Sequence, residues 1–266
     1  MGKAWDSTGI AFNPAVWSEV LRVLAPGTYL MAFGGTRTFH RMTCAIEDAG
    51  FEIRDCLMWL YGTGFPKSKS CLKPSYEPII LARKPGKTSQ PLNIDGCKIG
   101  DEIRLSPLCK GDSTYSGGWT GGKPSLITGR WPANVILDES FAEKEWSRYF
   151  YCAKASRKER DMGLQDFPLA PGIRTNAPRP SENAKTGHHL NNHPTVKPLS
   201  LTEHLAKLIL PQPSPDGWRR LLVPFSGSGS EMIGGIKAGW DEVTGIELST
   251  EYAAIAESRI EYWRAA

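Results

Sequence analysis

Several features that would point to a membrane, to export or to a metal are absent from the sequence. No apolar run approaches the roughly 20 residues that a membrane-spanning helix needs. The first residues, MGKAWDSTG, have neither the basic start nor the apolar stretch of a signal peptide, so the cytoplasm is the expected location. The six cysteines form no CxxC pair, which argues against a zinc site and a disulfide framework. We therefore expect free thiols, no metal and no membrane segment.

The composition is that of a globular protein, and its excess charge is concentrated in the middle of the chain. With 266 residues, 40% hydrophobic and 23% charged, the chain can bury a core as one α/β domain or as a domain with an insertion. Residues 84–190 hold 16 Lys and Arg against 12 Asp and Glu, whereas the remainder holds 16 of each. This local bias suits a polyanionic partner, and a solvated, weakly basic loop region explains it equally well.

Helix patterns alternate with strand patterns in the first and last parts of the chain. Helices are expected at 14–24, 36–50, 199–210, 228–239 and 249–263, and strands at 28–33, 51–61, 75–84, 219–225 and 241–247. Asn13 is a plausible cap of the first helix, and the strand at 219–225 has a buried, apolar pattern. This alternation predicts a parallel, layered α/β sheet.

The pattern breaks in the middle. Residues 84–190 are rich in Gly, Pro, Ser and Asn, with short strand-like pieces at 130–138 and 147–155 and no sustained helix. Residues 171–192 have little apolar content, so mobility is expected there. The expected division is 1–83, an inserted module at 84–190, and 191–266.

The most informative constellation runs from Leu221 to Ile260. A strand ends in a glycine-rich turn that opens a helix, and Glu247 closes the next strand about 20 residues later. Gly227 and Gly229 let a ligand approach the backbone, while the carboxylate can accept both hydroxyls of a ribose. The pattern predicts a site for an adenosine-containing cofactor, and NAD remains open on this element alone.

The preceding segment narrows the choice. HPTVKPLSLTEHLAKLIL, followed by the PFSGSG turn, resembles the joined motifs of the β group of DNA amino-methyltransferases. In that group the histidine, proline and lysine segment lies against the methionine end of S-adenosylmethionine. The resemblance therefore implies a set of cofactor-binding residues: His193, Thr195, Lys197, Pro198, Phe225, Ser226, Gly227, Gly229 and Glu247.

The resemblance covers nearly the whole chain, since residues 17–68, YEPIILARK, RWPANVILD and SRYFYCAKAS also look like family segments. It implies a Rossmann-like class I S-adenosylmethionine methyltransferase sheet in circular order, with a target-recognition region at 84–190. It also implies double-stranded DNA as substrate and methyl transfer to the exocyclic amine of adenine or cytosine, with adenine favoured only by its frequency in the family. A homodimer is allowed.

Two departures from the family pattern concern the site. Val223 stands where relatives usually have an aspartate, and the catalytic tetrapeptide, Asp, Asn or Ser followed by Pro-Pro and an aromatic, is absent. The catalytic residues are therefore unassigned, and Trp5-Asp6 is better interpreted as a turn than as a substitute. Because the strand that carries the tetrapeptide lies between those at 28–33 and 219–225 in the family fold, we expect an N-terminally incomplete sheet, with a gap or a makeshift pairing there. No methyl transfer by the chain alone is expected.

Two other interpretations remain. One is a catalytically inactive fragment or remnant that binds DNA or S-adenosylmethionine; the other, a methyltransferase of RNA or small molecules, gives no reason for the basic insertion. The candidate DNA-binding residues are Arg37, Lys154, Arg157 and Lys158. For these residues, a solvated helix face or an exposed turn is the competing interpretation.

Overall fold

The computed structural model describes residues 8–62, 64, 66, 68–87, 90–105, 126–153, 158–171, 188–213 and 217–265. The first part contains η1 (Ile10–Phe12), α1 (Pro14–Val23), β1 (Tyr29–Phe33), α2 (Phe39–Asp48), β2 (Glu52–Leu60) and β3 (Tyr76–Arg83). The middle part contains η2 (Asp95–Cys97), β4 (Ile99–Leu105), β5 (Leu126–Arg130), β6 (Val135–Asp138), η3 (Glu139–Phe141), η4 (Glu145–Tyr149), β7 (Tyr151–Ala153), η5 (Lys158–Arg160), β8 (Ala170–Pro171) and β9 (His188–His189). The last part contains α3 (Leu199–Leu208), β10 (Arg220–Val223), α4 (Ser230–Ala238), β11 (Glu242–Gly245) and α5 (Thr250–Ala265).

The expected helices and strands of the first and last parts are present, and their ends follow local chemistry. The side chain of Asn13 accepts a hydrogen bond from the amide of Ala15, which confirms the predicted cap of α1. The short strands at 130–138 and 147–155 are also present, as β6 and β7. Five cysteines are free thiols, as expected, and the sixth, Cys109, lies outside the described residues. Mobility was expected for residues 171–192, of which 172–187 lie outside the described residues; at the described end of that segment, Asn191 is fully buried.

The main sheet has five strands in the order β1-β3-β2-β6-β7. The expectation of a parallel sheet is only partly right, because β3 is antiparallel to both β1 and β2, whereas β2, β6 and β7 are parallel. The physical reason is the connection: no helix lies between β2 and β3 in the part of the chain that the structure describes, and a direct connection returns the chain antiparallel.

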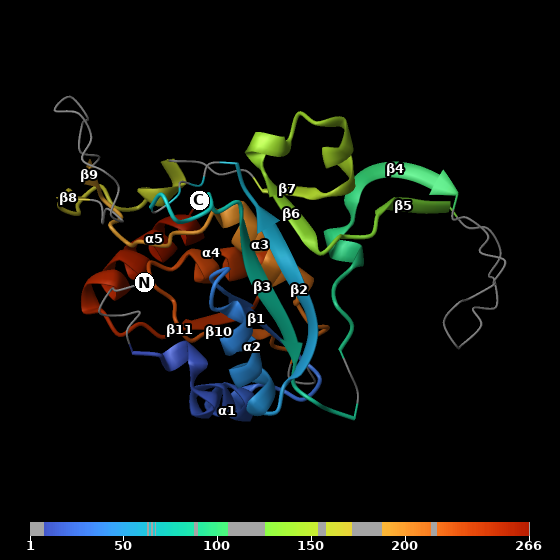
Figure 1. Cartoon of the computed structure of the whole chain (residues 1–266), viewed down its shortest axis with the longest axis horizontal. Coiled ribbons are helices and arrows are strands. Elements are labelled where there is room, and N and C mark those ends of the chain that lie inside the picture. Colours follow the sequence, from blue (N-terminus) through green and yellow to red (C-terminus); the bar gives the residue numbers. More distant parts are fainter. Residues whose placement is uncertain are drawn as a thin grey trace.

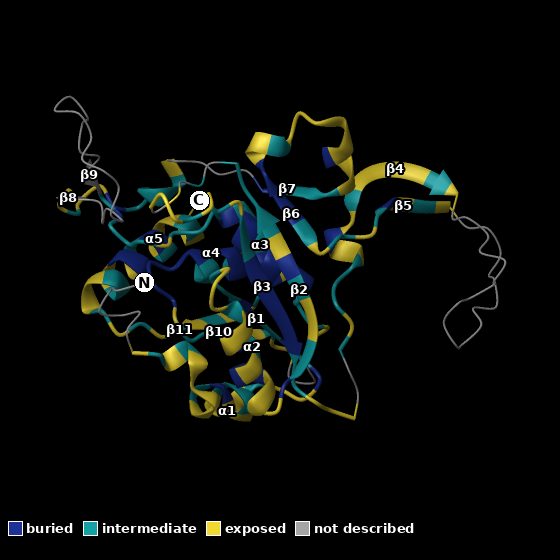
Figure 2. Ribbon diagram, in the orientation of Figure 1, coloured by how far each residue is buried: buried dark blue, intermediate teal, exposed yellow. Residues whose placement is uncertain are grey.

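Strand β3 is the centre of a three-layered arrangement. Ile79 and Leu81 pack on the α3 side, in a cluster with Leu201 and Leu205. Ile80 and Ala82 point the other way, toward the cluster that holds residues of α1 and α2. Both faces of β3 are therefore buried, as Figure 2 shows by its dark colour.

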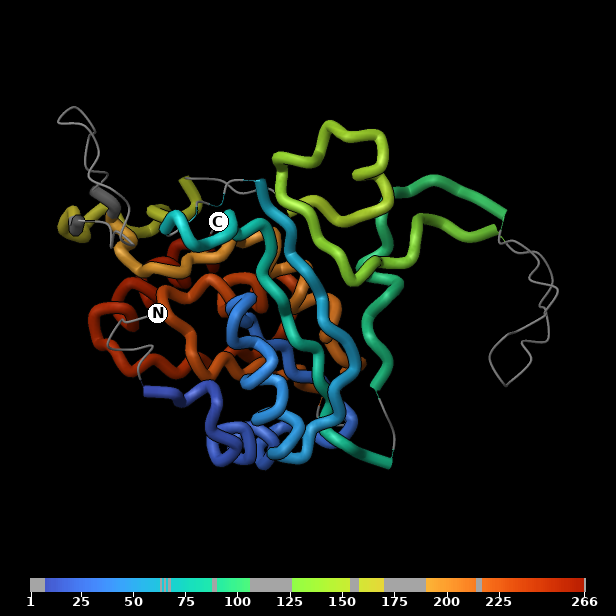
Figure 3. The backbone as a smooth tube through the Cα atoms, viewed as in Figure 1, coloured from blue at the N-terminus to red at the C-terminus, as the bar shows by residue number. Residues whose placement is uncertain are grey.

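The segment 84–190 contributes to the main sheet as well as standing apart from it. Strands β6 and β7 extend the sheet beyond β2, so this part of the segment is built into the core. The antiparallel hairpin β4–β5, by contrast, projects from the body of the molecule (Figures 1 and 3). The boundaries at 84 and 190 remain a prediction about domains, and the hairpin is the portion that is separate in space.

Strands β10 and β11 form a parallel pair of their own. The expectation that the first is buried is wrong: Arg220 is exposed and the other residues of β10 are half-buried, because β10 pairs on one side only. Among the described residues, β1 and β10 stand at the edges of two separate sheets and are not paired with each other; an N-terminally incomplete sheet stays a prediction.

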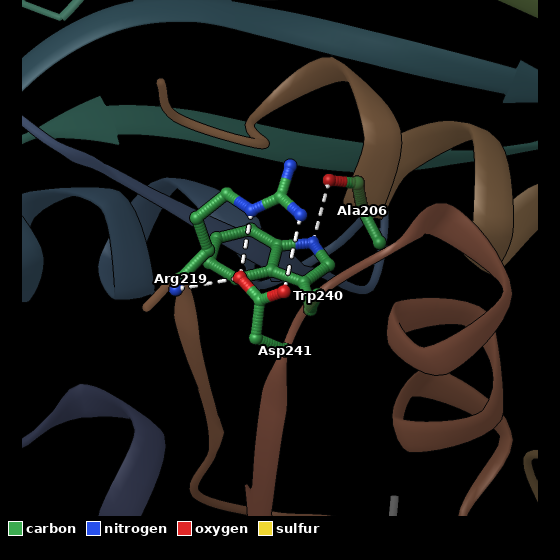
Figure 4. A network of polar contacts seen from close by, with 4 residues as sticks. All are labelled: Ala206, Arg219, Trp240 and Asp241. Carbon is green, nitrogen blue, oxygen red and sulfur yellow. Dashed lines mark hydrogen bonds and ion pairs between the residues drawn. The ribbon is translucent and has the colours of Figure 1, made fainter. Parts of the chain in front are cut away.

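A polar network fixes the beginning of the β10–β11 pair (Figure 4). The carboxylate of Asp241 accepts hydrogen bonds from Nε and Nη2 of Arg219 at 2.8 and 3.2 Å, and from the amide of Arg219 at 2.9 Å. The indole N–H of Trp240 donates to the carbonyl of Ala206 at 3.0 Å and so ties the pair to α3.

In the part of the chain described, none of the helices is long and apolar enough to span a bilayer.

Candidate functional site

The glycine turn between β10 and α4 has the backbone conformation that its glycines allow. Gly227 has φ +51° and Gly229 has φ +81°, both in the left-handed region that L residues rarely adopt. A Cβ on Gly227 would lie 2.7 Å from Nε2 of His193, and one on Gly229 would lie 3.1 Å from Cβ of Ala256. Glycine is therefore required at Gly227 both by conformation and by the approach of His193.

The carboxylate of Glu247 lies directly beside this turn. Oε2 accepts a hydrogen bond from the amide of Gly227 at 2.9 Å, and Oε1 accepts one from the amide of Ser249 at 2.9 Å. The amide of Ser226 donates to the carbonyl of Ile246 at 2.9 Å, which holds the turn against the end of β11. The structure thus brings together the glycine turn and the acidic residue that the sequence singles out.

His193 closes the turn from the other side. Its ring lies edge-on against Tyr252 with centroids 4.6 Å apart, and Nδ1 accepts a hydrogen bond from the amide of Thr195 at 3.3 Å. Burial lowers the pKa of His193 to about 4; the carboxylate of Glu247 opposes this shift and nearby cations reinforce it. The imidazole is therefore neutral near pH 7. Thr195 itself is exposed, and Pro198 stands at the N-cap of α3.

Lys197 points toward the main sheet. Its ammonium lies 2.5 Å from Oε2 of Glu77, at the start of β3. It also lies 4.8 Å from the ring centroid of Phe33 and 5.9 Å from that of Trp59. Lys197 is therefore already paired with a carboxylate, and binding the carboxylate of a cofactor would have to compete with Glu77.

The family assignment follows from comparison with known proteins. The N6/N4 family model, described as DNA methylase, matches residues 6–258. The chain belongs to the DNA methylase family.

One curated protein of known type matches part of the chain. The type II methyltransferase M.HindIII of Haemophilus influenzae is 30% identical over 100 residues, a match that covers 29% of this chain and 32% of the relative. The matched part thus spans about a third of that curated relative's length.

Two solved structures share the fold of this methylase family member. The M1.HpyAVI–SAM complex aligns over 93% of this chain and 81% of its own, with a TM-score of 0.50 at 16% identity. The cytosine-N4-specific PvuII DNA methyltransferase aligns over 92% and 71%, with a TM-score of 0.51 at 12% identity. At these identities the likeness concerns the fold alone, that of a class I methyltransferase with a mixed sheet.

A buried polar network behind the turn was missed by sequence reasoning. Asn191 and Arg259 are 0% exposed, and Ser228 is 3% exposed. The hydroxyl of Ser228 accepts hydrogen bonds from the side chains of both Asn191 and Arg259 and so links them. Arg160, from η5, joins the same network. One signal was available: Ile255, Ala256 and Arg259 share the buried face of α5, so an arginine on that face needs polar partners.

Two of the four candidate DNA-binding residues of this family member lie in the part described. Arg37 is exposed before α2, and Lys158 is exposed on η5. Lys158 borders a hollow of about 440 Å³ with Asp161, Met162 and Gln165. Lys154, Arg157 and the pair Trp5-Asp6 lie outside the described residues.

Proposed function

We propose that the chain binds S-adenosylmethionine and takes part in transferring its methyl group to the exocyclic amine of a base in double-stranded DNA. The observation that carries the proposal is the junction of Glu247, the Gly227 turn and His193 in a member of the DNA methylase family. Adenine and cytosine both remain candidates for the base.

The carboxylate of Glu247 is suited to the ribose. Each of its oxygens accepts one backbone hydrogen bond, and a carboxylate can accept about four in all. The two backbone bonds fix its orientation and leave lone pairs for two vicinal hydroxyls. A carboxylate whose orientation is already fixed loses little side-chain entropy when it accepts hydrogen bonds from the ribose hydroxyls.

Apolar surface flanks the same carboxylate. Ile246 and Leu248, its two neighbours in sequence, are 56% and 99% exposed, and Phe225 in the turn is 50% exposed. Three large, exposed apolar side chains beside one carboxylate favour a ligand with a flat aromatic ring. We assign this surface to the adenine ring.

Charged groups on the opposite side fit the amino-acid end of the cofactor. The cations of Arg160, Arg259 and Lys197 lower the pKa of His193, whereas the carboxylate of Glu247 raises it, so groups of both signs act on this ring. Glu231, in the first turn of α4, interacts with Lys197 and Arg259, which lower its pKa, whereas burial has the larger effect and raises it. A carboxylate and an ammonium can therefore both be accommodated here, even with Val223 in place of an aspartate.

When bound, S-adenosylmethionine supplies a methyl group on a positively charged sulfur, which an amine can displace. The described residues contribute to that reaction by holding the two ends of the cofactor. Positioning of this kind is a large part of catalysis for a reaction between two bound groups. The catalytic side chains are unassigned, and a protein that binds cofactor and DNA without methyl transfer is the second candidate.

Calorimetry with S-adenosylmethionine tests the cofactor site. Glu247→Ala removes an acceptor of charged hydrogen bonds and should weaken binding by roughly 1.5–3 kcal/mol. Glu242→Ala, at the other end of β11, removes a carboxylate that pairs with Arg220 and serves as the matched control. Unchanged affinity in Glu247→Ala, or equal losses in both variants, would remove the assignment.

Transfer of labelled methyl groups from S-adenosylmethionine to unmethylated genomic DNA tests the reaction. Incorporation by the purified chain supports the enzyme and overturns the expectation that the chain alone transfers no methyl group. Digestion of the product to nucleosides distinguishes methylated adenine from methylated cytosine. Cofactor binding without incorporation supports the second candidate.

For DNA, we propose that segment 84–190 locates the target, with the β4–β5 hairpin as its projecting part. Ile99 and Arg130 face each other across the base of this hairpin, so residues 100–129 can be replaced by a short Gly-Ser linker without cutting the sheet. DNA affinity should fall in that variant, and binding by the parent chain should weaken as salt rises. Full DNA affinity in the folded linker variant contradicts the proposal. A cytoplasmic location and a homodimer remain predictions.

A further inference from the structure

The segment around η5 lies against the back of the proposed cofactor site, although the sequence places it in the target-recognition region. Arg160 is half-buried, and burial lowers the pKa of its guanidinium. Nε donates to the carbonyl of Asn191 at 2.9 Å, and Nη2 donates to the carbonyl of His193 at 2.8 Å. One planar side chain thus fixes two carbonyls of the His193 segment at once.

Asn191 connects that segment to the glycine turn. Its Oδ1 accepts from the amide of His193 at 3.1 Å, and its Nδ2 donates to Oγ of Ser228 at 3.1 Å and to the carbonyl of Arg160 at 3.2 Å. Its own amide donates to Oδ1 of Asp161 at 3.0 Å. All polar groups of a fully buried side chain are therefore used to join η5, the His193 segment and the turn.

Arg259 supports the same turn from α5. Nη1 donates to the carbonyl of Ser228, to its Oγ at 3.2 Å and to Oγ of Ser230 at 3.2 Å. Nη2 reaches the carbonyl of Glu159 at 3.5 Å. Because Ser228 Oγ accepts from both Asn191 and Arg259, its hydroxyl hydrogen has to point away from both donors.

We propose that Arg160 and Asn191 are positioning residues of the cofactor site, which set the separation between the His193 segment and the glycine turn. The inference rests on the proposed function, because these two backbone segments are the ones assigned to the cofactor. It goes further by assigning a role to η5, which belongs to segment 84–190. In this inference, hydrogen bonds from η5 hold the cofactor site in its binding geometry. Each residue acts through the backbone and side chains of the segments that are assigned to the cofactor.

The bonding pattern explains why the residue types matter. Arg160 offers a rigid fork whose two donors reach two different carbonyls, whereas lysine offers one mobile ammonium. Loss of the fork leaves the carbonyls of Asn191 and His193 without those donors and lets the His193 segment move relative to the turn. Cofactor affinity should therefore fall by more than the loss of stability alone would cause.

The test is calorimetric titration of S-adenosylmethionine into the wild type, Arg160→Ala and Arg160→Lys, with urea denaturation of each. Arg160→Ala should weaken binding roughly tenfold or more, comparable with the loss of a hydrogen bond to a charged group. Arg160→Lys should recover only a small part of that loss, because a single ammonium cannot reach both carbonyls. Arg83→Ala is the matched control, since Arg83 is 17% exposed and paired with Glu52 on the main sheet.

A spectroscopic measurement separates positioning from general destabilisation. In the wild type, the imidazole resonances of His193 should titrate near pH 4, and in Arg160→Ala the midpoint should rise, in part because the charge of Arg160 is lost. In Arg160→Lys, which keeps the charge, a rise of the midpoint reports the greater exposure of the displaced ring. Arg83→Ala should leave that midpoint in place. If Arg160→Ala does not fold, Arg160→Gln, which keeps one donor, is measured in its place against the same expectations.

The outcomes are distinguishable. If the wild type binds no S-adenosylmethionine, the proposed function fails and this inference fails with it. If the wild type binds and the Arg160 variants bind within about twofold of it, only the positioning role is overturned. An equal loss of affinity in Arg83→Ala would also overturn the positioning role, because the effect would then follow stability alone.

Discussion

Replacing Gly227 by alanine is the most direct perturbation of the turn. The residue has φ +51°, and an L side chain in the left-handed region costs about 1–2 kcal/mol. The added Cβ would lie 2.7 Å from Nε2 and 2.8 Å from Cε1 of His193, and Cβ atoms in proteins essentially never approach other atoms so closely. The imidazole therefore has to move.

Moving the ring has its own cost. It breaks the hydrogen bond from the amide of Thr195 and the edge-on contact with Tyr252, each worth roughly 0.5–1.5 kcal/mol. Together with the backbone strain, Gly227→Ala should lower the free energy of unfolding by about 2–5 kcal/mol. It should also weaken S-adenosylmethionine binding, because His193 and the turn are displaced together.

Gly239→Ala is the control, measured in the same urea denaturation and calorimetric experiments. Gly239 has φ +91° at the other end of α4, and a Cβ there would meet no atom within 4 Å. This variant should lose about 1–2 kcal/mol of stability from strain and keep its cofactor affinity. Equal losses of stability and affinity in the two variants would refute the role given to the contact between Gly227 and His193.

Three further predictions concern stability. Burial lowers the pKa of His204 from 6.5 to about 4, so as pH falls below 6.5 only the unfolded chain gains the proton, and about 3 kcal/mol of stability is lost by pH 4. His204→Phe, which keeps the stack on Tyr151, should remove that dependence in urea denaturation at several pH values; an unchanged slope argues against it. Glu77→Gln should cost about 1.5–3 kcal/mol because it leaves the ammonium of Lys197, 10% exposed, without its carboxylate. Lys197→Met in the same chain should recover part of this loss, and a double-mutant cycle without coupling would contradict the pairing. Hydrogen bonds from the side chain and the amide of Arg219 hold the pKa of Asp241 at about 2, so their contribution is present above pH 4 and is lost as pH falls toward 2. Asp241→Asn should lower the melting temperature at pH 7 and reduce the dependence of stability on pH in this acid range. A melting temperature equal to that of the wild type would exclude a stabilising role for these hydrogen bonds.

The local parts of the fold could be predicted because their causes are local. The Asn13 cap of α1 and the glycines at Gly227 and Gly229 each depend on a few neighbouring residues. The alternation of helix and strand also gave the layers correctly. The direction of β3 could not be deduced in the same way, because it depends on how the chain returns after β2.

The site was predictable where its residues are close in sequence and not where they meet across the chain. Glu247 follows the turn by 20 residues, and its hydrogen bond to Gly227 agrees with that spacing. Lys197 and Glu77 are 120 residues apart in the sequence, so neither local segment predicts their contact. Arg160 stands two residues after the candidate DNA-binding residue Lys158, and a run of basic residues does not reveal which of them is turned inward.

The unequal cover of the strands has a consequence for amide hydrogen exchange. Strand β3 is paired on both edges and buried on both faces, so its amides should exchange only through the largest openings of the structure. Along β1, which is paired on one edge, the amides that face β3 should be slow and the alternate ones faster. The β4–β5 hairpin should exchange first. A deuterium pulse would therefore trace the order in which parts of the protein open, from the projecting hairpin inward to the strand at its centre.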